Sequence, residues 1–473
     1  MLVQLRDQLA AAGSAEEYLS RLFEKAEKSR LNGFTTLARE SALERAREFD
    51  KKPWGGLMAG VPIAIKECIS TQAIETNCSS RILQGYVPPF DAHVVERLKA
   101  EGAIIMGKTN MDEFAMGSST ETSCFGPTHN PWDLDCVPGG SSGGSAAVVA
   151  GGEAPAALGS DTGGSVRCPA SFCGIVGLKP TYGLVSRFGL IAYANSLEQI
   201  GPLTQSVEDT ALLMEIIAGH DWRDTTSADK DRWSYLPDLN RGVAGIKIGI
   251  PKEYFGEGVN KEVEKAVWDG VATLEALGAS WQEVSLPHTR YALAAYYVIA
   301  MSEASSNLAR FDGLRYGLRL REDRDWHTTF SEIRSQGFGP EVKRRILLGT
   351  YALSAGYYGR YYLKALKVRT LIKDDFLRAF KEVDLVAGPT MPIPAFRIGE
   401  RINDPLSLYL ADVFTVPINL AGVPAISVPC GFAGRLPIGL QLIGRHFDEA
   451  TVLRAAQTFE TATSFHQARP EVV

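Results

Sequence analysis

Two serines stand among glycines within 24 residues of each other in the middle of the chain. Ser141 lies in the run GGSSGGS, and Ser165 lies in the run DTGGS. Glycine lets the backbone turn so that successive N–H groups point to one side, where they can hold an oxyanion beside a serine hydroxyl. The second run follows an apolar segment and precedes a predicted helix, whose N-terminus adds positive potential. This pattern favours acyl transfer to a serine nucleophile.

Other interpretations of these runs fit less well. A flexible linker is not expected where an apolar, small-residue segment follows at once, and a phosphate-binding loop needs a Gly-Lys-Ser/Thr that is missing here. Residues 102–109 (GAIIMGKT) match that loop in spacing, but their apolar middle is typical of a strand. Residues 139–143 match the G-x-S-x-G nucleophile elbow, yet the preceding HNPWDLDCVPGG predicts a loop instead of the required strand. A glycine turn with a helix-capping serine stays open for DTGGS.

A serine nucleophile needs a base, and Lys66 is the candidate. It ends the β-type run VPIAIK, in which Val61, Ile63 and Ile65 share one face while Ala64 and Lys66 share the other. An exposed lysine stays protonated, whereas burial lowers the pKa of the ammonium group and leaves a neutral amine. Taken alone, Lys66 fits a solvated strand end better than a catalytic base.

Strands and helices alternate along almost the whole chain. Strands are predicted at 61–66, 103–107, 155–159, 246–250, 281–284, 383–387, 425–428 and 438–443, and helices at 91–101, 145–150, 165–172, 207–218, 259–277 and 450–461. A helical N-terminal segment covers about 1–50, and a helical insertion covers about 290–380. We expect an α/β fold, a mixed β-sheet flanked by helices on both sides, in one large domain over 1–473. Asp221–Gly242 is the best candidate for a boundary.

Composition excludes several classes of protein. The net charge of −6 over 473 residues gives no broad basic field for nucleic acid, although a local patch or a partner could still contact RNA. The seven cysteines are scattered without a C-x-x-C pair, which argues against a disulfide framework or a zinc site and favours the cytoplasm. No signal peptide and no membrane span are predicted.

Residues 139–182 and the segment GVPIAIKE around Lys66 resemble the amidase signature family. The resemblance implies a Ser–cis-Ser–Lys triad on a mixed sheet, without a histidine or a metal. In it Ser165 is the nucleophile, Lys66 the base, and Ser141, after a cis peptide bond, relays the proton. It further implies an oxyanion hole formed by the backbone N–H groups of Thr162, Gly163 and Gly164 with that of Ser165. It also implies that three side chains support the site: Ser142, Asp161 and Arg167.

The chain also resembles, nearly end to end, the glutaminase A subunits of tRNA-dependent amidotransferases. The matching segments include MDEFAMGSSTE, HNPWDLDCVPGGSSGGSAAVVA and RRILLGTYALSAGYYGRYYLKALKVR. The resemblance implies that glutamine is the substrate and that ammonia passes to a B subunit. That subunit binds the tRNA and uses ATP, with Mg, to amidate Glu-tRNA(Gln), with Asp-tRNA(Asn) as a second candidate. A small C subunit completes the complex, and no cofactor is expected in this chain.

Free glutamine is a zwitterion, so a glutaminase needs a cation for its carboxylate and an anion for its ammonium group. The resemblance places Arg345 on the carboxylate, Asp412 on the ammonium and Tyr296 as a wall, so that the helical insertion contributes to the pocket. One departure is Cys168, where such subunits commonly carry Gln. A stand-alone amidase for small or aromatic amides and a scaffold with a vestigial site remain alternatives.

Overall fold

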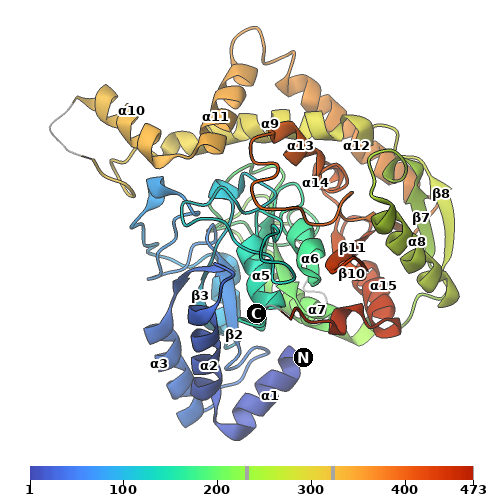
Figure 1. Cartoon of the computed structure of the whole chain (residues 1–473), viewed down its shortest axis with the longest axis horizontal. Coiled ribbons are helices and arrows are strands. Elements are labelled where there is room, and N and C mark those ends of the chain that lie inside the picture. The colour runs from blue at the N-terminus through green and yellow to red at the C-terminus, as the bar shows by residue number, and fades with distance from the viewer. Residues whose placement is uncertain (230–233, 321–324, 472–473) are drawn as a thin grey trace.

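A computed structural model describes residues 1–229, 234–320 and 325–471. Within them, eleven strands form one sheet in the order β1-β3-β2-β4-β6-β5-β10-β11-β9-β7-β8 (Figure 1). β2 is parallel to β3 and β4, and β7 is parallel to β8 and β9, while the other neighbours are antiparallel. The expected mixed α/β sheet is therefore confirmed.

The strands and helices have the following bounds. The strands are β1 (Phe34–Leu37), β2 (Pro62–Lys66), β3 (Ile104–Thr109), β4 (Ala156–Asp161), β5 (Val176–Lys179), β6 (Gln199–Thr204), β7 (Lys247–Pro251), β8 (Ser280–Val284), β9 (Leu385–Pro389), β10 (Ala425–Ala433) and β11 (Leu436–Ile443). The α-helices are α1 (Leu2–Ala12), α2 (Ala15–Lys28), α3 (Arg39–Lys51), α4 (His93–Ala100), α5 (Gly143–Ala150), α6 (Arg167–Cys173), α7 (Val207–Ile217), α8 (Lys261–Ala276), α9 (Ala292–Asn307), α10 (Trp326–Gly337), α11 (Pro340–Leu353), α12 (Tyr362–Ala379), α13 (Pro405–Leu410), α14 (Val416–Ala421) and α15 (Glu449–Ala462).

The sheet runs through the whole molecule without a domain break. β6 precedes the expected boundary loop 221–242 and β7 follows it, yet both belong to the same sheet. Residues 230–233 of that loop lie outside the described residues. The chain therefore folds around one sheet, as expected of a single large domain.

β2 is buried on both faces, which explains its apolar sequence. Ile63 and Ile65 belong to the hydrophobic core that also contains α4 and α7 side chains, whereas Ala64 belongs to the core on the α5 side. Because side chains alternate along a strand, Lys66 shares the face of Ala64. The strand therefore directs its terminal lysine toward α5 and the serine segment before it.

Small residues let α5 approach its neighbours closely. Every residue of the helix is buried. A side chain at Gly143 would overlap the hydroxyl of Thr120, and one at Gly144 would overlap the backbone of Asn110. The glycines are thus required by close contact, and they fix the N-terminus of α5 directly after Ser141 and Ser142.

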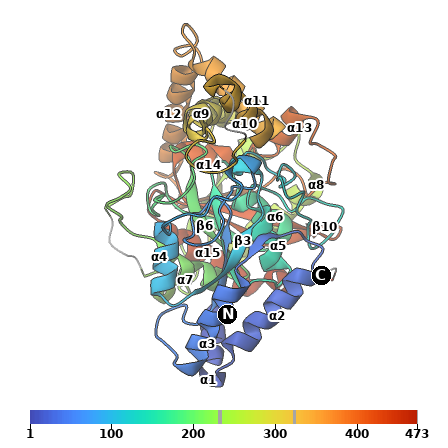
Figure 2. The ribbon, with the colours of Figure 1, turned by 90° about the vertical axis from the view of Figure 1, so that its left-hand side faces the viewer.

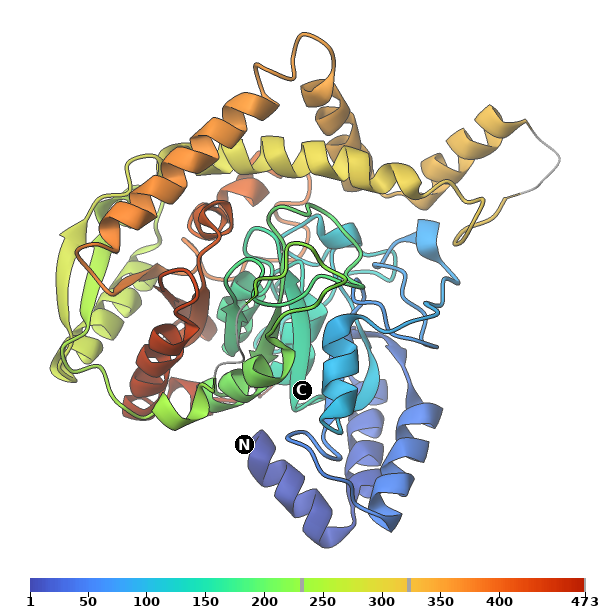
Figure 3. The ribbon, with the colours of Figure 1, turned by 180° about the vertical axis from the view of Figure 1, so that it is seen from behind.

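The helices from α9 to α12 form a layer at one end of the molecule, and α1–α3 lie at the opposite end (Figures 1 and 2). Seen from behind, α9 lies across the top of the view with α12 beside it (Figure 3). Two expectations need correction here. Residues 34–37, within the expected helical segment 1–50, form the edge strand β1, paired with β3. The expected helical insertion of about 290–380 is interrupted at its tyrosine-rich run 351–362, because α11 ends at Leu353 and α12 begins at Tyr362.

Candidate active site

Lys66 lies at the end of β2 and is completely buried among hydroxyl groups. Its Nζ lies 2.8 Å from Ser141 Oγ, 2.8 Å from Ser142 Oγ and 3.0 Å from Ser160 Oγ. Burial lowers the pKa of the ammonium group, although neighbouring acidic groups oppose this effect. A neutral amine keeps two N–H donors and gains one lone pair. The site therefore suits an amine that accepts a proton from an adjacent hydroxyl.

The two glycine-rich loops meet next to this lysine. The Gly140–Ser141 peptide bond is cis, as the resemblance implied. The N–H of Ser142 donates to the carbonyl of Ser165 at 3.1 Å, so the loop that carries Ser141 lies against the loop that carries Ser165. Ser165 is 7% exposed, whereas Ser141 and Lys66 are fully buried. Of the three residues, Ser165 is thus the one that a substrate can reach.

The loop after β4 presents free backbone N–H groups beside Ser165. Those of Thr162, Gly163 and Ser165 make no hydrogen bond within the described part of the chain. The N–H of Gly164 differs from our expectation, because it donates to Asp161 Oδ1 at 2.8 Å. We therefore remove Gly164 from the expected oxyanion hole and retain the other three N–H groups.

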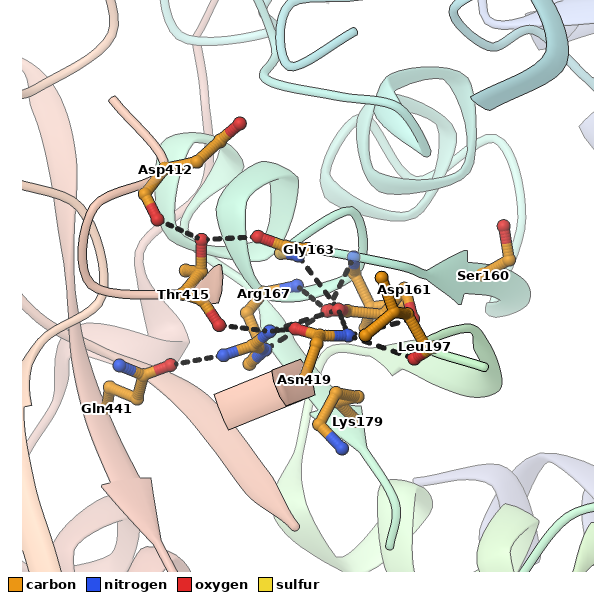
Figure 4. A network of polar contacts seen from close by, with 12 residues as sticks. Ser160, Asp161, Gly163, Arg167, Lys179, Leu197, Asp412, Thr415, Asn419 and Gln441 are labelled. Carbon is orange, nitrogen blue, oxygen red and sulfur yellow. Dashed lines mark hydrogen bonds and ion pairs between the residues drawn. The ribbon is translucent and has the colours of Figure 1, made fainter. Parts of the chain in front are cut away.

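A buried polar network fixes this loop (Figure 4). Asp161 and Arg167 are both fully buried and form an ion pair, with Arg167 Nη2 3.0 Å from Asp161 Oδ1. Arg167 also donates to Asn419 at 2.6 Å and to Gln441 at 2.7 Å. Burial alone would raise the pKa of Asp161, but the charge and hydrogen bonds of Arg167 hold it well below its usual range. Asp161 therefore stays an anion and accepts the Gly164 N–H.

Arg345 projects inward from α11 into a cage of tyrosines. Its Nε donates to Glu341 at 2.8 Å and its Nη1 donates to the hydroxyl of Tyr193 at 2.7 Å. The rings of Tyr193, Tyr297 and Tyr409 surround the guanidinium at 5.3 to 5.6 Å. Nη2 makes no hydrogen bond to any described residue. One edge of the cation is thus open to a ligand.

Asp412 lies after α13, and one oxygen of its carboxylate is held. Oδ2 accepts from Ser118 Oγ at 2.7 Å and from the hydroxyl of Tyr297 at 3.1 Å. Oδ1 makes no hydrogen bond among residues 1–229, 234–320 and 325–471. Burial raises the pKa of Asp412 to about 7, although both hydrogen bonds oppose the increase. Tyr297 therefore contacts the Asp412 carboxyl group through its hydroxyl group, and it contacts the Arg345 guanidinium through its ring.

Tyr296 connects these charged residues to the loop that carries Ser165. A Cβ atom on Gly163 would lie 2.5 Å from Cζ and from the hydroxyl of Tyr296, so the tyrosine ring lies directly on the loop. Tyr296 also packs edge-on against Tyr297, with ring centroids 5.0 Å apart. A chain of contacts thus links Arg345 and Asp412, through Tyr297 and Tyr296, to Gly163 in the loop that carries Ser165.

Three residues at this site were not anticipated from the sequence: Ser118, Tyr193 and Tyr297. Ser118 stands in the segment MDEFAMGSSTE and Tyr297 stands next to Tyr296. Neither pattern indicates that these side chains hold Asp412. The position of Ser118 within MDEFAMGSSTE and that of Tyr297 beside Tyr296 are the only sequence signals for these contacts.

The departure at Cys168 reaches the same region. The thiol is buried on α6 and lies 3.7 Å from the carbonyl oxygen of Ser118, to which it donates. Burial raises the pKa of this thiol well above its usual value, so it stays protonated. Cys168 therefore contacts the segment that holds Asp412, and the hydrogen bonds of Lys66 within the described residues do not involve its thiol.

Two further observations concern metals and membranes. No group of three or more His, Cys, Asp or Glu side chains in the described residues is arranged to hold a metal ion. No helix among those residues has both the length and the apolar character needed to span a membrane.

Residues 16–453 match the family described as Amidase, and the chain therefore belongs to the amidase family. It is 66% identical over 460 residues to the A subunit of Glutamyl-tRNA(Gln) amidotransferase from Methanosarcina mazei, with 97% of this chain and 96% of that protein covered. The protein of the same name from Methanosarcina acetivorans is 63% identical over 472 residues, which cover 100% of this chain and 98% of that protein. The A subunit of Glutamyl-tRNA(Gln) amidotransferase from Thermotoga maritima, known from a crystal structure, is 44% identical in sequence. The two structures superpose with a TM-score of 0.83 over 97% of this chain and 94% of that chain.

Proposed function

We propose that this chain is the glutaminase subunit of a tRNA-dependent amidotransferase. The observation that carries the proposal is the pair of opposite charges beside the nucleophile loop. Arg345 has one free edge, Asp412 has one free oxygen, and Tyr297 contacts both. This arrangement complements the carboxylate and ammonium groups of free glutamine. The names of the relatives support the same conclusion.

In the proposed reaction Ser165 attacks the side-chain amide of glutamine. Neutral Lys66 accepts the proton of Ser141, which in turn accepts the proton of Ser165. The N–H groups of Thr162, Gly163 and Ser165 stabilise the oxyanion of the tetrahedral intermediate. The proton then returns through Ser141 to the amide nitrogen, and ammonia leaves. Water cleaves the glutamyl ester by the same proton route and releases glutamate.

The helical insertion of about 290–380 supplies much of the proposed glutamine pocket. Tyr296 comes from α9 and Arg345 from α11, while Asp412 comes from the segment after α13. Glutamine would lie with its α-carbon groups between Arg345 and Asp412 and its amide against the loop 162–165. Tyr296 then forms the wall between the two ends of the substrate.

The ammonia would be used by a partner. A B subunit would bind the tRNA and ATP, with Mg, and amidate Glu-tRNA(Gln), and a small C subunit would complete the heterotrimer. Asp-tRNA(Asn) is a second candidate acceptor. This chain then needs no cofactor of its own. We also infer a cytoplasmic location, because aminoacyl-tRNA is used there and all seven cysteines are free.

Exchange of Ser165 for alanine tests the proposal. Ser165→Ala should lower glutamine-dependent amidation of Glu-tRNA by at least about 10³-fold, because no covalent ester can form. Amidation from free ammonium should persist, since that step belongs to the partner. Ser171→Ala, a buried serine of α6, is the matched control. Retention of glutamine-dependent activity by Ser165→Ala contradicts the proposed nucleophile.

Exchange of Arg345 separates glutaminase activity from a stand-alone amidase for small or aromatic amides. Loss of a charge-assisted hydrogen bond to the substrate carboxylate should raise the KM for glutamine by about 10- to 100-fold. Arg345→Ala should leave the KM for a simple amide without a carboxylate unchanged. Measurement of KM for both substrates decides the matter, and an unchanged value for glutamine favours the stand-alone amidase.

A further inference from the structure

The hairpin of α11 and α12, with the turn between them, exposes an unusual concentration of large apolar side chains. Leu347 is 71% exposed, and Leu348, Tyr351, Tyr358, Tyr361 and Leu363 are also exposed. We call these six side chains the hairpin surface. The turn projects from the helical layer, at the end of the molecule opposite α1–α3 (Figures 1 and 2). Clustered apolar exposure of this kind typically marks an interaction site.

The tyrosines of this turn already support one another. The rings of Tyr351 and Tyr357 lie 4.6 Å apart, and those of Tyr357 and Tyr361 are stacked at 5.8 Å. Tyr358 stacks on Tyr362 at 5.6 Å. Such preorganised rings lose little conformational entropy on binding, and tyrosine and arginine are enriched at protein interfaces.

The charge of this region is opposite to that of the whole chain. Residues 342–373 contain eight basic residues and no acidic one, although the chain carries a net charge of −6. Five of the eight are exposed: Arg344, Arg360, Lys364, Lys367 and Lys373. A partner that binds here gains from carboxylates around its contact face.

The hairpin surface lies directly behind the glutamine-binding arginine. Arg345 and Leu347 are two residues apart on α11, a spacing that places their side chains on opposite faces of the helix. Arg345 is accordingly buried while Leu347 is exposed. A partner on the outer face would therefore lie about 10 Å, one helix diameter, from the cation that holds the substrate.

We propose that the hairpin surface is the docking site of the partner subunit that consumes the ammonia, through a face with apolar pockets ringed by carboxylates. The identity of this partner rests on the proposed function. Leucine favours a protein over RNA, because it offers neither a stacking face nor a hydrogen bond to a base. A second copy of this chain is disfavoured, because a two-fold contact would bring the basic residues together.

Binding of the co-purified B and C subunits to variants of this chain tests the proposal. Leu347→Lys and the double variant Tyr358→Ser/Tyr361→Ser should each raise the Kd for the partner subunits at least about 10-fold. Arg360→Glu/Lys364→Glu should raise it as well, and more strongly at low salt. Labelling of Ser165 by a serine-directed acylating probe should remain at the wild-type level, which shows that the variants fold.

Matched controls come from elsewhere on the surface. Lys51→Glu/Lys52→Glu reverses two exposed charges at the end of α3, and Leu277→Lys changes an exposed leucine after α8. Both should bind the partner subunits like the wild type. Equal binding by wild type and hairpin variants overturns the inference while the proposed function stands. If the wild type itself binds neither of the two partners, the proposed function fails and the inference fails with it.

Two other results would show that the hairpin surface binds RNA or a second copy of this chain instead of the partner subunit. Leu347→Lys adds a cation, so it should weaken a protein contact without weakening an RNA contact. Direct binding of Glu-tRNA that is lost in Arg360→Glu/Lys364→Glu, with unchanged binding of the B and C subunits, overturns the inference in favour of RNA. A dimer of the isolated chain that Leu347→Lys dissociates, seen by sedimentation velocity, overturns it in favour of self-association.

Discussion

At the residue scale, two buried groups of opposite type give the site its chemistry. Burial lowers the pKa of Lys66 and raises that of Asp412, because in each case a charge is removed from water. The same physical effect therefore has two uses in the proposed reaction. It prepares a neutral amine as the base, and it places the titration of a substrate-binding carboxylate near neutral pH.

The pKa of Asp412 predicts a pH dependence of glutamine use. With a pKa of about 7 in the free protein, the carboxyl group is neutral below that pH and cannot pair with an ammonium group. The kcat/KM for glutamine should therefore rise as pH rises through about 7, and a pH profile of kcat/KM measures it. Protonation of Lys66 also lowers kcat/KM at low pH. The contributions of Asp412 and Lys66 to the pH profile must therefore be measured separately.

Asp412→Asn provides the separation. This variant should lose the rise near pH 7 and show a lower kcat/KM for glutamine at pH 8, by about 10-fold or more. For a simple amide without an ammonium group, the pH dependence of hydrolysis by the wild type should reflect the titration of Lys66 alone. Asp269→Asn, an exposed carboxylate on α8, is the control. A rise near pH 7 that persists unchanged in Asp412→Asn would rule out Asp412 as its source.

At the element scale, the loop after β4 depends on contacts from helices far along the chain. Thr415 Oγ1 donates to the carbonyl of Gly163 at 2.6 Å, and Tyr296 of α9 covers the same glycine. α9 and the segment before α14 therefore hold the carbonyl side of Gly163 while its N–H stays free. The glycines of DTGGS serve this close approach as well as the turn.

A methyl group at Gly163 should damage the oxyanion hole. Gly163→Ala places a carbon 2.5 Å from the ring of Tyr296, so the loop or the ring must move. We expect kcat for glutamine hydrolysis to fall by about 10²- to 10³-fold, the usual effect of losing one oxyanion donor. Gly55→Ala is a matched control, because open space surrounds that position. Equal kcat values for the two variants would show that the loop tolerates the displacement.

At the scale of the whole molecule, one buried arginine joins distant parts of the chain. Arg167 binds Asp161 at the end of β4, Asn419 on α14 and Gln441 on β11. These partners lie up to 274 residues from it in sequence. The loop that carries Ser165 is thus attached through a single guanidinium to α14 and to β11, an interior strand far along the chain.

Removal of this arginine should destabilise the fold. Arg167→Met leaves Asp161 buried without its cation, which should lower the free energy of unfolding by about 3–5 kcal/mol. Lys265→Met, which breaks the exposed pair with Asp269, should cost less than about 1 kcal/mol. Urea unfolding followed by circular dichroism measures both. If Arg167→Met costs no more than the surface control, the network does not stabilise the fold.

Some features of this protein follow from local sequence alone. The alternation in VPIAIK predicts a strand with Lys66 on the face opposite Ile63 and Ile65, and the structure places them so. The run DTGGS predicts a turn at the end of a strand, which β4 confirms. These predictions succeed because side-chain periodicity and glycine turns are properties of neighbouring residues.

Other features were decided only by tertiary contacts. β5 and β6 were missed because Gly177 and Pro202 weaken their strand patterns, and a side chain at Gly201 would overlap the backbone of β5. The Gly164 N–H is not free to join the proposed oxyanion hole, because the Asp161 carboxylate, held by Arg167, accepts it. Ser118 meets Asp412 across 294 residues. No local pattern encodes such contacts, because they depend on how separate elements pack.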